Sequence, residues 1–338
     1  MTPEMETTRP PDLLTPRQFN PDHPPERPRP VYQIGDSVIS SVGNLFNVQA
    51  LPKAGKSSFL AALIAAPIVG NRIGPDTFGF TAENPEGKAL IHIDTEQSAF
   101  DHDQLVRRAL LRAKTGDVPP WLMSYCLTDL SIADRKKALL DAIELANETH
   151  GGIFAILIDG IADLCADPND PAEAFALVGW IHTLAMVNQC AIGTVLHENP
   201  GSDSGKTRGH LGSQLERKAE TNLRLAKDSN GITSIWAERA RHCHLPKDSA
   251  VCFHFSTEAG MHVSCGDARE IKSAAIREKL QAEADKAFGG EEVMSYTDLV
   301  DATMQAFTIL ERAAKGRVSK WASEGITTKT TDGRYRIS

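Results

Sequence analysis

The sequence has few features of a secreted, membrane-spanning or nucleic-acid-coating protein. Its six cysteines are scattered without a C-x-x-C pair, which favours reduced thiols over a disulfide framework. No apolar run approaches the roughly 18 residues that a membrane helix needs, and the N-terminus lacks the basic-then-apolar layout of a signal peptide. The net charge of −8 confines any nucleic-acid contact to a local basic feature. We therefore expect a cytoplasmic protein without a membrane segment.

The length of the chain accommodates one main domain and a small appended one. With 338 residues, 41% of them hydrophobic, the chain can form a core of roughly 200–250 residues plus a second unit. Residues 1–30 contain nine prolines and almost no apolar periodicity, so we expect a disordered proline-rich tail.

From residue 31 onward, apolar runs rich in β-branched residues alternate with helical patterns. The predicted strands are 45–49, 89–93, 154–158 and 191–196, and the predicted helices are 59–68, 104–114, 132–149 and 172–188. This alternation predicts an α/β fold with a mostly parallel sheet and helices on both faces. After Gly212, three closely spaced runs at 221–226, 232–238 and 251–255 predict an antiparallel C-terminal extension of the sheet.

The segment after the first predicted strand matches the phosphate-binding loop G-x-x-x-x-G-K-[ST], with Ala50 in place of the first glycine. In such a loop, backbone N–H groups and the positive end of the following helix surround the phosphates. Lys56 reaches the β- and γ-phosphates, and the Ser57 hydroxyl binds Mg²⁺. Ala50 and Pro52 alter the loop, because alanine resists some turns and proline has no N–H. The expected ATP-binding residues are Pro52, Lys53, Ala54, Gly55, Lys56, Ser57 and Ser58.

Two strand-end carboxylates complete this predicted hydrolytic site. The apolar run 154–158 ends in Asp159, a Walker B layout in which Asp159 holds Mg²⁺ together with Ser57. The run 89–93 leads to Glu96, which can orient and deprotonate the attacking water. Asp94 is the alternative general base on the same segment. A turn carboxylate without a catalytic role is the other interpretation of Glu96.

These motifs, in the order P-loop, strand-end glutamate, Walker B aspartate and Thr194-Val195-Leu196-His197, resemble the RecA/DnaB superfamily of P-loop ATPases. Within it the chain is most similar to the RepA-type hexameric helicases of plasmids and mobile elements, whose P-loops read P-x-x-G-K-S. The resemblance covers about residues 31–260. It implies a RecA-like core, a homo-oligomeric ring that is a hexamer in this family, and a role for His197 as the sensor of the γ-phosphate. The alternative is that His197 is a strand-end histidine whose hydrogen bonds are satisfied within the fold and that has no sensor role.

The resemblance also implies contacts with DNA and with a neighbouring subunit. The segment 198–212 corresponds to loops facing the ring channel, where Lys206 and Arg208 would follow single-stranded DNA, although the segment lacks a stacking aromatic residue. Arg239 and Arg241 have the spacing of the basic pair that reaches a neighbour's active site. The alternative for the segment 198–212 is a flexible surface loop without a ligand. The alternative for Arg239 and Arg241 is that both form solvated ion pairs on the surface. The adjacent His242-Cys243-His244 run is poor geometry for zinc.

The C-terminal part of the chain is predicted to be a separate unit. Residues 268–290 form a charged, alanine-rich helical linker after the ATPase domain at 31–267. Residues 291–338 read as two helices and a hairpin with Asp332-Gly333 at its turn, a winged-helix-like domain. From residue 309 to the end, seven basic residues stand against three acidic ones, which favours duplex DNA over protein docking as its role.

The function predicted from these features is an ATP-hydrolysing ring motor on DNA, a RepA-like replicative DNA helicase of a mobile element. A RecA-like regulatory or remodelling ATPase without unwinding activity is the alternative. A P-loop small-molecule kinase is disfavoured, because the sequence offers no lid or acceptor pocket and the strand-end Glu96 suits water as the acceptor.

Overall fold

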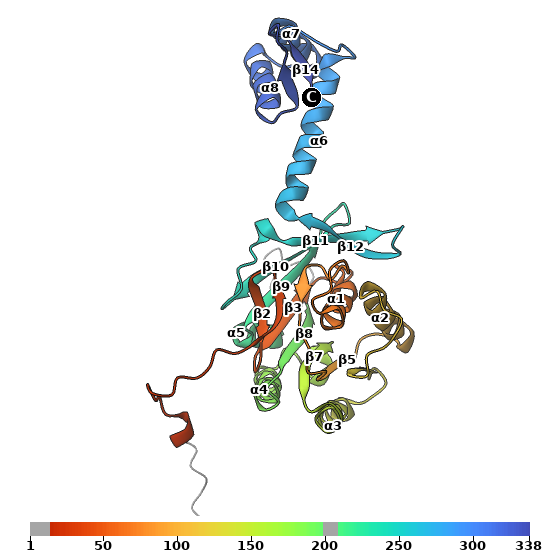
Figure 1. The fold of residues 1–338 in the computed structure, drawn as a ribbon, viewed down its shortest axis with the longest axis vertical. Coiled ribbons are helices and arrows are strands. Elements are labelled where there is room, and N and C mark those ends of the chain that lie inside the picture. Colours follow the sequence, from red (N-terminus) through yellow and green to blue (C-terminus); the bar gives the residue numbers. More distant parts are fainter. Residues whose placement is uncertain (1–13, 199–208) are drawn as a thin grey trace, which may run out of the picture.

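The computed structural model describes residues 14–198 and 209–338, and a nine-stranded sheet is its largest feature (Figure 1). The strand order is β12-β11-β10-β9-β3-β8-β7-β5-β6. The block from β9 to β6 is parallel, and β10, β11 and β12 continue it antiparallel. The strands are β3 (Leu45–Ala50), β5 (Ala89–Asp94), β6 (Leu122–Cys126), β7 (Ile153–Asp159), β8 (Ala191–His197), β9 (Thr221–Lys227), β10 (Thr233–Ala240), β11 (Val251–Ser256) and β12 (Met261–Asp267). The chain therefore has the predicted α/β architecture.

Helices cover both faces of the parallel block. Because successive strand residues point to opposite faces, Leu90 and Leu157 pack in one buried cluster with α1 and α2, whereas Ile91 and Ile156 pack in another with α3, α4 and α5. The helices are α1 (Lys56–Val69), α2 (Ala99–Arg112), α3 (Ile132–His150), α4 (Pro171–Val187) and α5 (Gly209–Lys218). Short 3-10 turns occur at Thr15–Arg17, Ile161–Leu164 and Lys247–Ser249.

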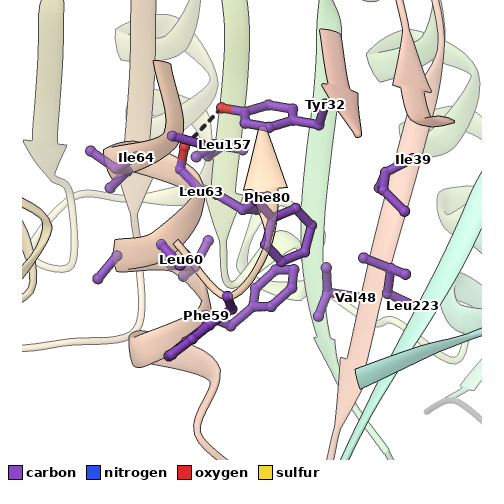
Figure 2. Close-up of a cluster of buried hydrophobic side chains, with 14 of the residues drawn as sticks. Tyr32, Ile39, Val48, Phe59, Leu60, Leu63, Ile64, Phe80, Leu157 and Leu223 are labelled. Atoms are coloured by element: carbon purple, nitrogen blue, oxygen red, sulfur yellow. Dashed lines mark hydrogen bonds between the residues drawn. The ribbon is translucent and has the colours of Figure 1, made fainter. Parts of the chain in front are cut away.

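A small second sheet closes the α1 side of the core. It has the order β2-β1-β4 and comprises β1 (Pro30–Ile34), β2 (Ser37–Ser41) and β4 (Phe80–Thr81). Figure 2 shows Tyr32 and Phe80 of this sheet against α1, where the Tyr32 hydroxyl donates a hydrogen bond to the Leu63 carbonyl oxygen (3.2 Å). The Phe80 ring packs edge-on against the Phe59 ring, with 5.3 Å between the ring centroids. These contacts hold the first helix after the P-loop against the sheet.

The C-terminal elements have a core of their own. They are α6 (Ala268–Phe288), α7 (Tyr296–Phe307), α8 (Glu311–Ser323), β13 (Thr327–Lys329) and β14 (Tyr335–Ile337). Asp267 and Glu270 form a capping box at the start of α6, and the Ser295 side chain caps α7. Leu280 and Phe288 of α6 are buried with Trp321 of α8. A division of the chain at residue 290 therefore separates residues that share one core.

Four local predictions differ from the structure. Strand β9 runs parallel to β3 and is not part of the antiparallel extension, because α5 returns the chain to the start of β3. That helix begins at Gly209, inside the segment 198–212 predicted to be a loop, and buries Leu211 and Leu215 one turn apart. Strands β6 and β12 were not expected. Both lie at sheet edges, where partial burial removes the long apolar run that marks an inner strand.

Candidate active site

The predicted P-loop connects the end of β3 to the start of α1. Ala50 is the last residue of β3, is fully buried and pairs with His197 on one side and Leu225 on the other. The position of the missing glycine is therefore extended strand, which alanine adopts without strain. Gly55 is the N-cap of α1 with φ 95°, and Lys53 has φ 63°, so the turn depends on left-handed backbone.

The antiparallel extension supports this loop from outside. A Cβ atom at Gly55 would lie 2.9 Å from the Phe253 ring of β11, so only glycine fits there. The Thr233 hydroxyl of β10 donates to the Ala54 carbonyl oxygen (3.2 Å), and Ser58 Oγ lies 2.8 Å from Nδ1 of His262 on β12. Phe253, Thr233 and His262 thus fix the loop and the first turn of α1.

The carboxyl ends of three neighbouring strands meet beside the P-loop. Asp94 at the end of β5 is the register partner of Asp159 at the end of β7, and His197 ends β8 next to Ala50. Glu96 follows β5 by two residues. In parallel sheets, ligands bind at this edge, where the strands' carboxyl ends open toward the helix N-termini.

A hydrogen-bonded chain joins the lysine, the histidine and the glutamate of the predicted site. Lys56 Nζ donates to His197 Nδ1 (2.9 Å), and His197 Nε2 lies 3.1 Å from Glu96 Oε2. With Nδ1 accepting, Nε2 carries the proton and donates to the carboxylate. Burial lowers the pKa of Lys56, and the charges of Glu96 and Asp159 oppose that shift. Lys56, Glu96 and His197, which are far apart in the sequence, therefore lie together.

Asp159 has the properties of a metal ligand. Its side chain is 3% exposed, and Oδ1 is buried without a hydrogen-bond partner among the described residues. Burial, with the nearby charges of Glu96 and Asp94, raises the pKa of Asp159 to about 7. A buried carboxylate oxygen without a donor fits a cation.

The set of metal-ligating side chains around Asp159 is small. The part of the chain that the structure describes contains no group of three or more His, Cys, Asp or Glu side chains arranged to hold a metal ion. Mg²⁺ at phosphate sites takes one or two protein ligands, and phosphate and water oxygens fill the other positions. The sequence predicts Ser57, the second residue of α1, and Asp159 as these two ligands.

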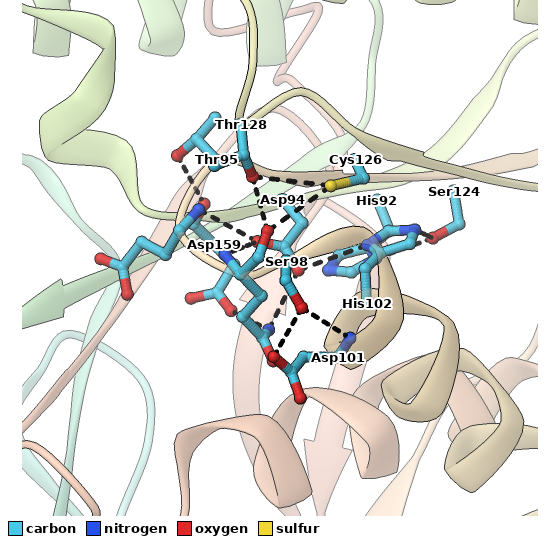
Figure 3. Close-up of polar contacts among 12 residues, drawn as sticks. His92, Asp94, Thr95, Ser98, Asp101, His102, Ser124, Cys126, Thr128 and Asp159 are labelled. Carbon is cyan, nitrogen blue, oxygen red and sulfur yellow. Dashed lines mark hydrogen bonds and ion pairs between the residues drawn. The ribbon is translucent and has the colours of Figure 1, made fainter.

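The alternative base, Asp94, is saturated with hydrogen bonds (Figure 3). Its side chain is fully buried, and Oδ1 accepts the backbone N–H groups of Glu96 (3.1 Å) and Gln97 (3.0 Å). Oδ2 accepts from Gln97 Nε2 (3.0 Å) and His102 Nδ1 (3.3 Å). Burial acts to raise the pKa of Asp94, but the bonds from His102 and Gln97 outweigh it and leave the pKa below its usual value. Asp94 therefore organises the turn that carries Glu96.

Behind Asp94 lies a pair of stacked histidines that the sequence did not indicate. The ring centroids of His92 and His102 are 5.3 Å apart, and the two rings are parallel within 2°. Ser124 Oγ lies between them, 2.9 Å from His92 Nδ1 and 3.1 Å from His102 Nε2. Burial and the neighbouring His102 lower the pKa of His92 to about 4, so that ring is neutral at pH 7.

Gly160 allows the β5 and β7 ends to approach closely. It has φ 87°, and a Cβ atom there would lie 2.3 Å from Thr95 Oγ1 and 2.7 Å from Glu96 Cγ. The Thr95 backbone N–H and hydroxyl both donate to the Asp159 carbonyl oxygen, at 3.1 and 3.0 Å. A side chain at residue 160 would displace Glu96.

The predicted arginine pair lies at the other end of the strands, near the amino ends of β3 and β9 and away from the carboxyl ends that meet beside the P-loop. Ala240, between Arg239 and Arg241, pairs with Thr221, and Thr221 pairs with Phe46 near the start of β3. About 13 Å of strand therefore separates this pair from the P-loop of the same chain. Arg239 forms an ion pair with Glu216 (3.3 Å), and Arg241 is exposed.

The predicted channel segment can be described only at its two ends. Lys206 and Arg208 lie outside the described residues. Just before them, Glu198 is buried and accepts two hydrogen bonds from Arg224 of β9, at 2.7 and 3.1 Å. This bidentate pair, which the sequence did not reveal, fixes the chain directly after His197.

The C-terminal unit presents basic side chains on α8 and on the β13–β14 hairpin. The exposed cations are Arg312, Lys315, Lys320, Lys329, Arg334 and Arg336. Met294 forms an isolated antiparallel bridge with Tyr335, so the residues before α7 lie beside the hairpin.

No protein-family model matches the sequence, and no curated protein matches it. Among the described residues, no helix is long and apolar enough to cross a membrane.

Proposed function

We propose that this chain is a Mg²⁺-dependent P-loop ATPase of the RecA-like kind and that it works on DNA as a ring-forming motor, a RepA-like replicative helicase. One observation carries the hydrolytic part of this proposal. Lys56, His197 and Glu96 form a hydrogen-bonded chain beside the buried Asp159, at the carboxyl edge of a parallel sheet and next to a helix N-terminus.

Each side chain has a distinct role in phosphoryl transfer to water. Lys56 leaves His197 and neutralises charge on the β- and γ-phosphates. Mg²⁺, held by Ser57 and Asp159, supplies further charge neutralisation on the triphosphate when it is bound. Glu96, whose side chain is 29% exposed, orients the attacking water and accepts its proton. His197 contacts both Lys56 and Glu96 and therefore responds to the presence of a γ-phosphate between them.

The ring part of the proposal is supported by the position of the arginines. Arg239 and Arg241 lie at the far end of the strands from the P-loop of their own chain, so neither reaches a triphosphate bound there. In a ring, the far edge of one subunit can face the nucleotide edge of the next. An arginine supplied in this way stabilises charge on the transferring γ-phosphoryl group.

The DNA part is supported by local basic charge on an otherwise acidic protein. The exposed cations of α8 and the hairpin suit the phosphates of a duplex, and Lys206 and Arg208 suit a single strand in a channel. The net charge of −8 favours the alternative, a RecA-like ATPase that remodels protein partners without unwinding DNA.

ATP hydrolysis measured with and without Mg²⁺ and single-stranded DNA tests this proposal. We expect Mg²⁺-dependent hydrolysis that single-stranded DNA stimulates, together with a ring-sized particle when ATP is present. Lys56→Ala should abolish turnover, whereas Lys137→Ala, an exposed lysine paired with Asp141 on α3, should not change it. Normal turnover in Lys56→Ala would contradict the P-loop assignment. Hydrolysis without any response to DNA would favour the remodelling ATPase.

A further inference from the structure

We propose that Gln97 is a positioning residue that bridges the carboxylates at the ends of β5 and β7 and thereby holds Asp159 in the orientation that binds Mg²⁺. This inference rests on the proposed function, because it takes Asp159 as a metal ligand. Gln97 directly follows the glutamate assigned as the base and lies outside the motifs found in the sequence.

The side-chain amide of Gln97 satisfies both carboxylates at once. Nε2 donates to Asp94 Oδ2 at 3.0 Å and to Asp159 Oδ2 at 3.1 Å. An amide nitrogen has two hydrogens, so each carboxylate receives one. The two acids are register partners on adjacent strands and are 0% and 3% exposed, which places two acidic side chains side by side away from water. A shared neutral donor stabilises this arrangement without adding charge.

The bridge also determines which oxygen of Asp159 remains available. Oδ2 is taken by Gln97, whereas Oδ1 has no hydrogen-bond partner among the described residues although it is buried. The carboxylate is thus held by one oxygen and presents the other. A side chain that hydrogen-bonds to a metal ligand orients that ligand and fixes its rotamer.

The backbone of Gln97 is held as firmly as its side chain. Its N–H donates to Asp94 Oδ1 (3.0 Å), and its carbonyl oxygen accepts from the Thr128 hydroxyl (2.6 Å) and from Cys126 Sγ (3.5 Å). Cys126 is the last residue of β6, and Thr128 follows it by two residues. Figure 3 shows both side chains. The backbone of Gln97 is therefore anchored to the end of β6, on the far side of β5 from Asp159.

Asp94 is fixed in turn from α2 and β6. His102 Nδ1 donates to Asp94 Oδ2, and Ser124 connects His102 to His92. One set of protons satisfies these bonds: His92 donates to the Ser124 oxygen, Ser124 donates to His102 Nε2, and His102 donates to Asp94. The bridge at Gln97 thus rests on a buried network and not on a solvent-exposed turn.

Metal affinity distinguishes a bridging role from a packing role. Gln97→Met keeps the length of the side chain and removes both hydrogens. Binding of Mn²⁺ to the protein saturated with a non-hydrolysable ATP analogue, measured by electron paramagnetic resonance, should weaken about 10-fold to 100-fold, the range found for partners of metal ligands. Affinity for the metal-free nucleotide should stay the same. Gln281→Met, at a partly buried glutamine of α6 whose amide donates to Asp285, is the matched control and should bind Mn²⁺ as the wild type does.

A second variant covers the case in which Gln97→Met does not fold. Gln97→Asn keeps the amide but is one methylene too short to reach both carboxylates, so its Mn²⁺ affinity should also fall. Wild-type Mn²⁺ affinity in a folded Gln97→Met or Gln97→Asn protein would overturn the bridging role and leave the proposed ATPase intact. If the wild type itself fails to bind Mn²⁺ with the nucleotide, both proposals are wrong.

Discussion

Glu96 and Asp94 differ in what surrounds their carboxylates, although only Thr95 separates them in the sequence. Asp94 is buried and receives four hydrogen bonds, whereas Glu96 is partly exposed and contacts His197. A general base must have an oxygen that can face water. Asp94 therefore shapes the turn, and Glu96 is the side chain suited to the attacking water.

Asp159 is expected to cost stability at neutral pH because its pKa is about 7 in the folded protein, against a usual value of 3.8. Between these two values the folded state keeps a proton that the unfolded chain has lost, so the stability of the wild type falls as the pH rises. Asp159→Asn removes this penalty. The variant should be more stable at pH 8, and its advantage should shrink by about 1.4 kcal/mol for each pH unit below 7.

Urea unfolding of the two proteins between pH 5.5 and 8 measures this difference. Asn keeps an oxygen that can accept from Gln97, so the packing of the site should be retained. A stability difference that does not change with pH would contradict the raised pKa of Asp159.

The principal site residues could be predicted from the sequence because each follows an apolar run or a glycine-containing loop. Lys56, Glu96, Asp159 and His197 carry that local signal, and the structure brings them to one edge. Gln97, His102 and the Glu198–Arg224 pair carry none. Their partners are set by which strands are neighbours, and a single sequence gives strand order only weakly.

At the scale of elements, the strands near the centre of the sheet were predictable and those at its edges were not. The apolar run of β7 marks burial on both faces. Strand β6 at one edge and β12 at the other are only partly buried, so their patterns are mixed. Helix α5 was missed because Leu211 and Leu215 are its only large apolar residues in contact with the core.

Two truncations test whether helix α6 belongs to the C-terminal unit or to the ATPase core. A chain ending at Gly290 should retain ATPase activity but expose Leu280, Ala284 and Phe288, which are buried against α7 and α8 in the full chain. It should bind a hydrophobic dye and self-associate. A chain ending at Asp267 lacks α6 and should retain activity without dye binding.

Both truncated chains should lose affinity for duplex DNA, which fluorescence anisotropy measures, because they lack the cations of α8 and the hairpin. Equal dye binding by the two chains would contradict the shared core. Unchanged duplex affinity would give the C-terminal unit a protein-docking role.

At the scale of the whole molecule, the proposed ring requires the two ends of the parallel strands to supply complementary parts of one site. The carboxyl edge holds Lys56, Glu96 and Asp159, and the opposite edge presents Arg241 with Arg239 beside it. Arg241 also lines a small pocket with Arg27 and Glu220. A ring that joins opposite edges would complete the site at every interface.

Mixing of two inactive variants tests this complementation. Arg241→Ala should bind ATP and hydrolyse it about 10³-fold or more slowly, the contribution of an arginine supplied in trans. Mixed with Lys56→Ala, it should regain part of the activity, because some interfaces then combine an intact P-loop with an intact arginine. A mixture that stays inactive while both variants still oligomerise would show that Arg241 does not act in trans.

The hydrolysis rate of Glu96→Gln at full nucleotide occupancy tests the central claim most directly. The variant should bind Mg²⁺·ATP as the wild type does and hydrolyse it at least about a hundredfold more slowly, because the water loses its base. Glu86→Gln, an exposed carboxylate paired with Lys88, should hydrolyse ATP normally. If Glu96→Gln turns over at the wild-type rate, or if Asp94→Asn alone binds ATP without hydrolysing it, the assignment of Glu96 as the catalytic base is wrong.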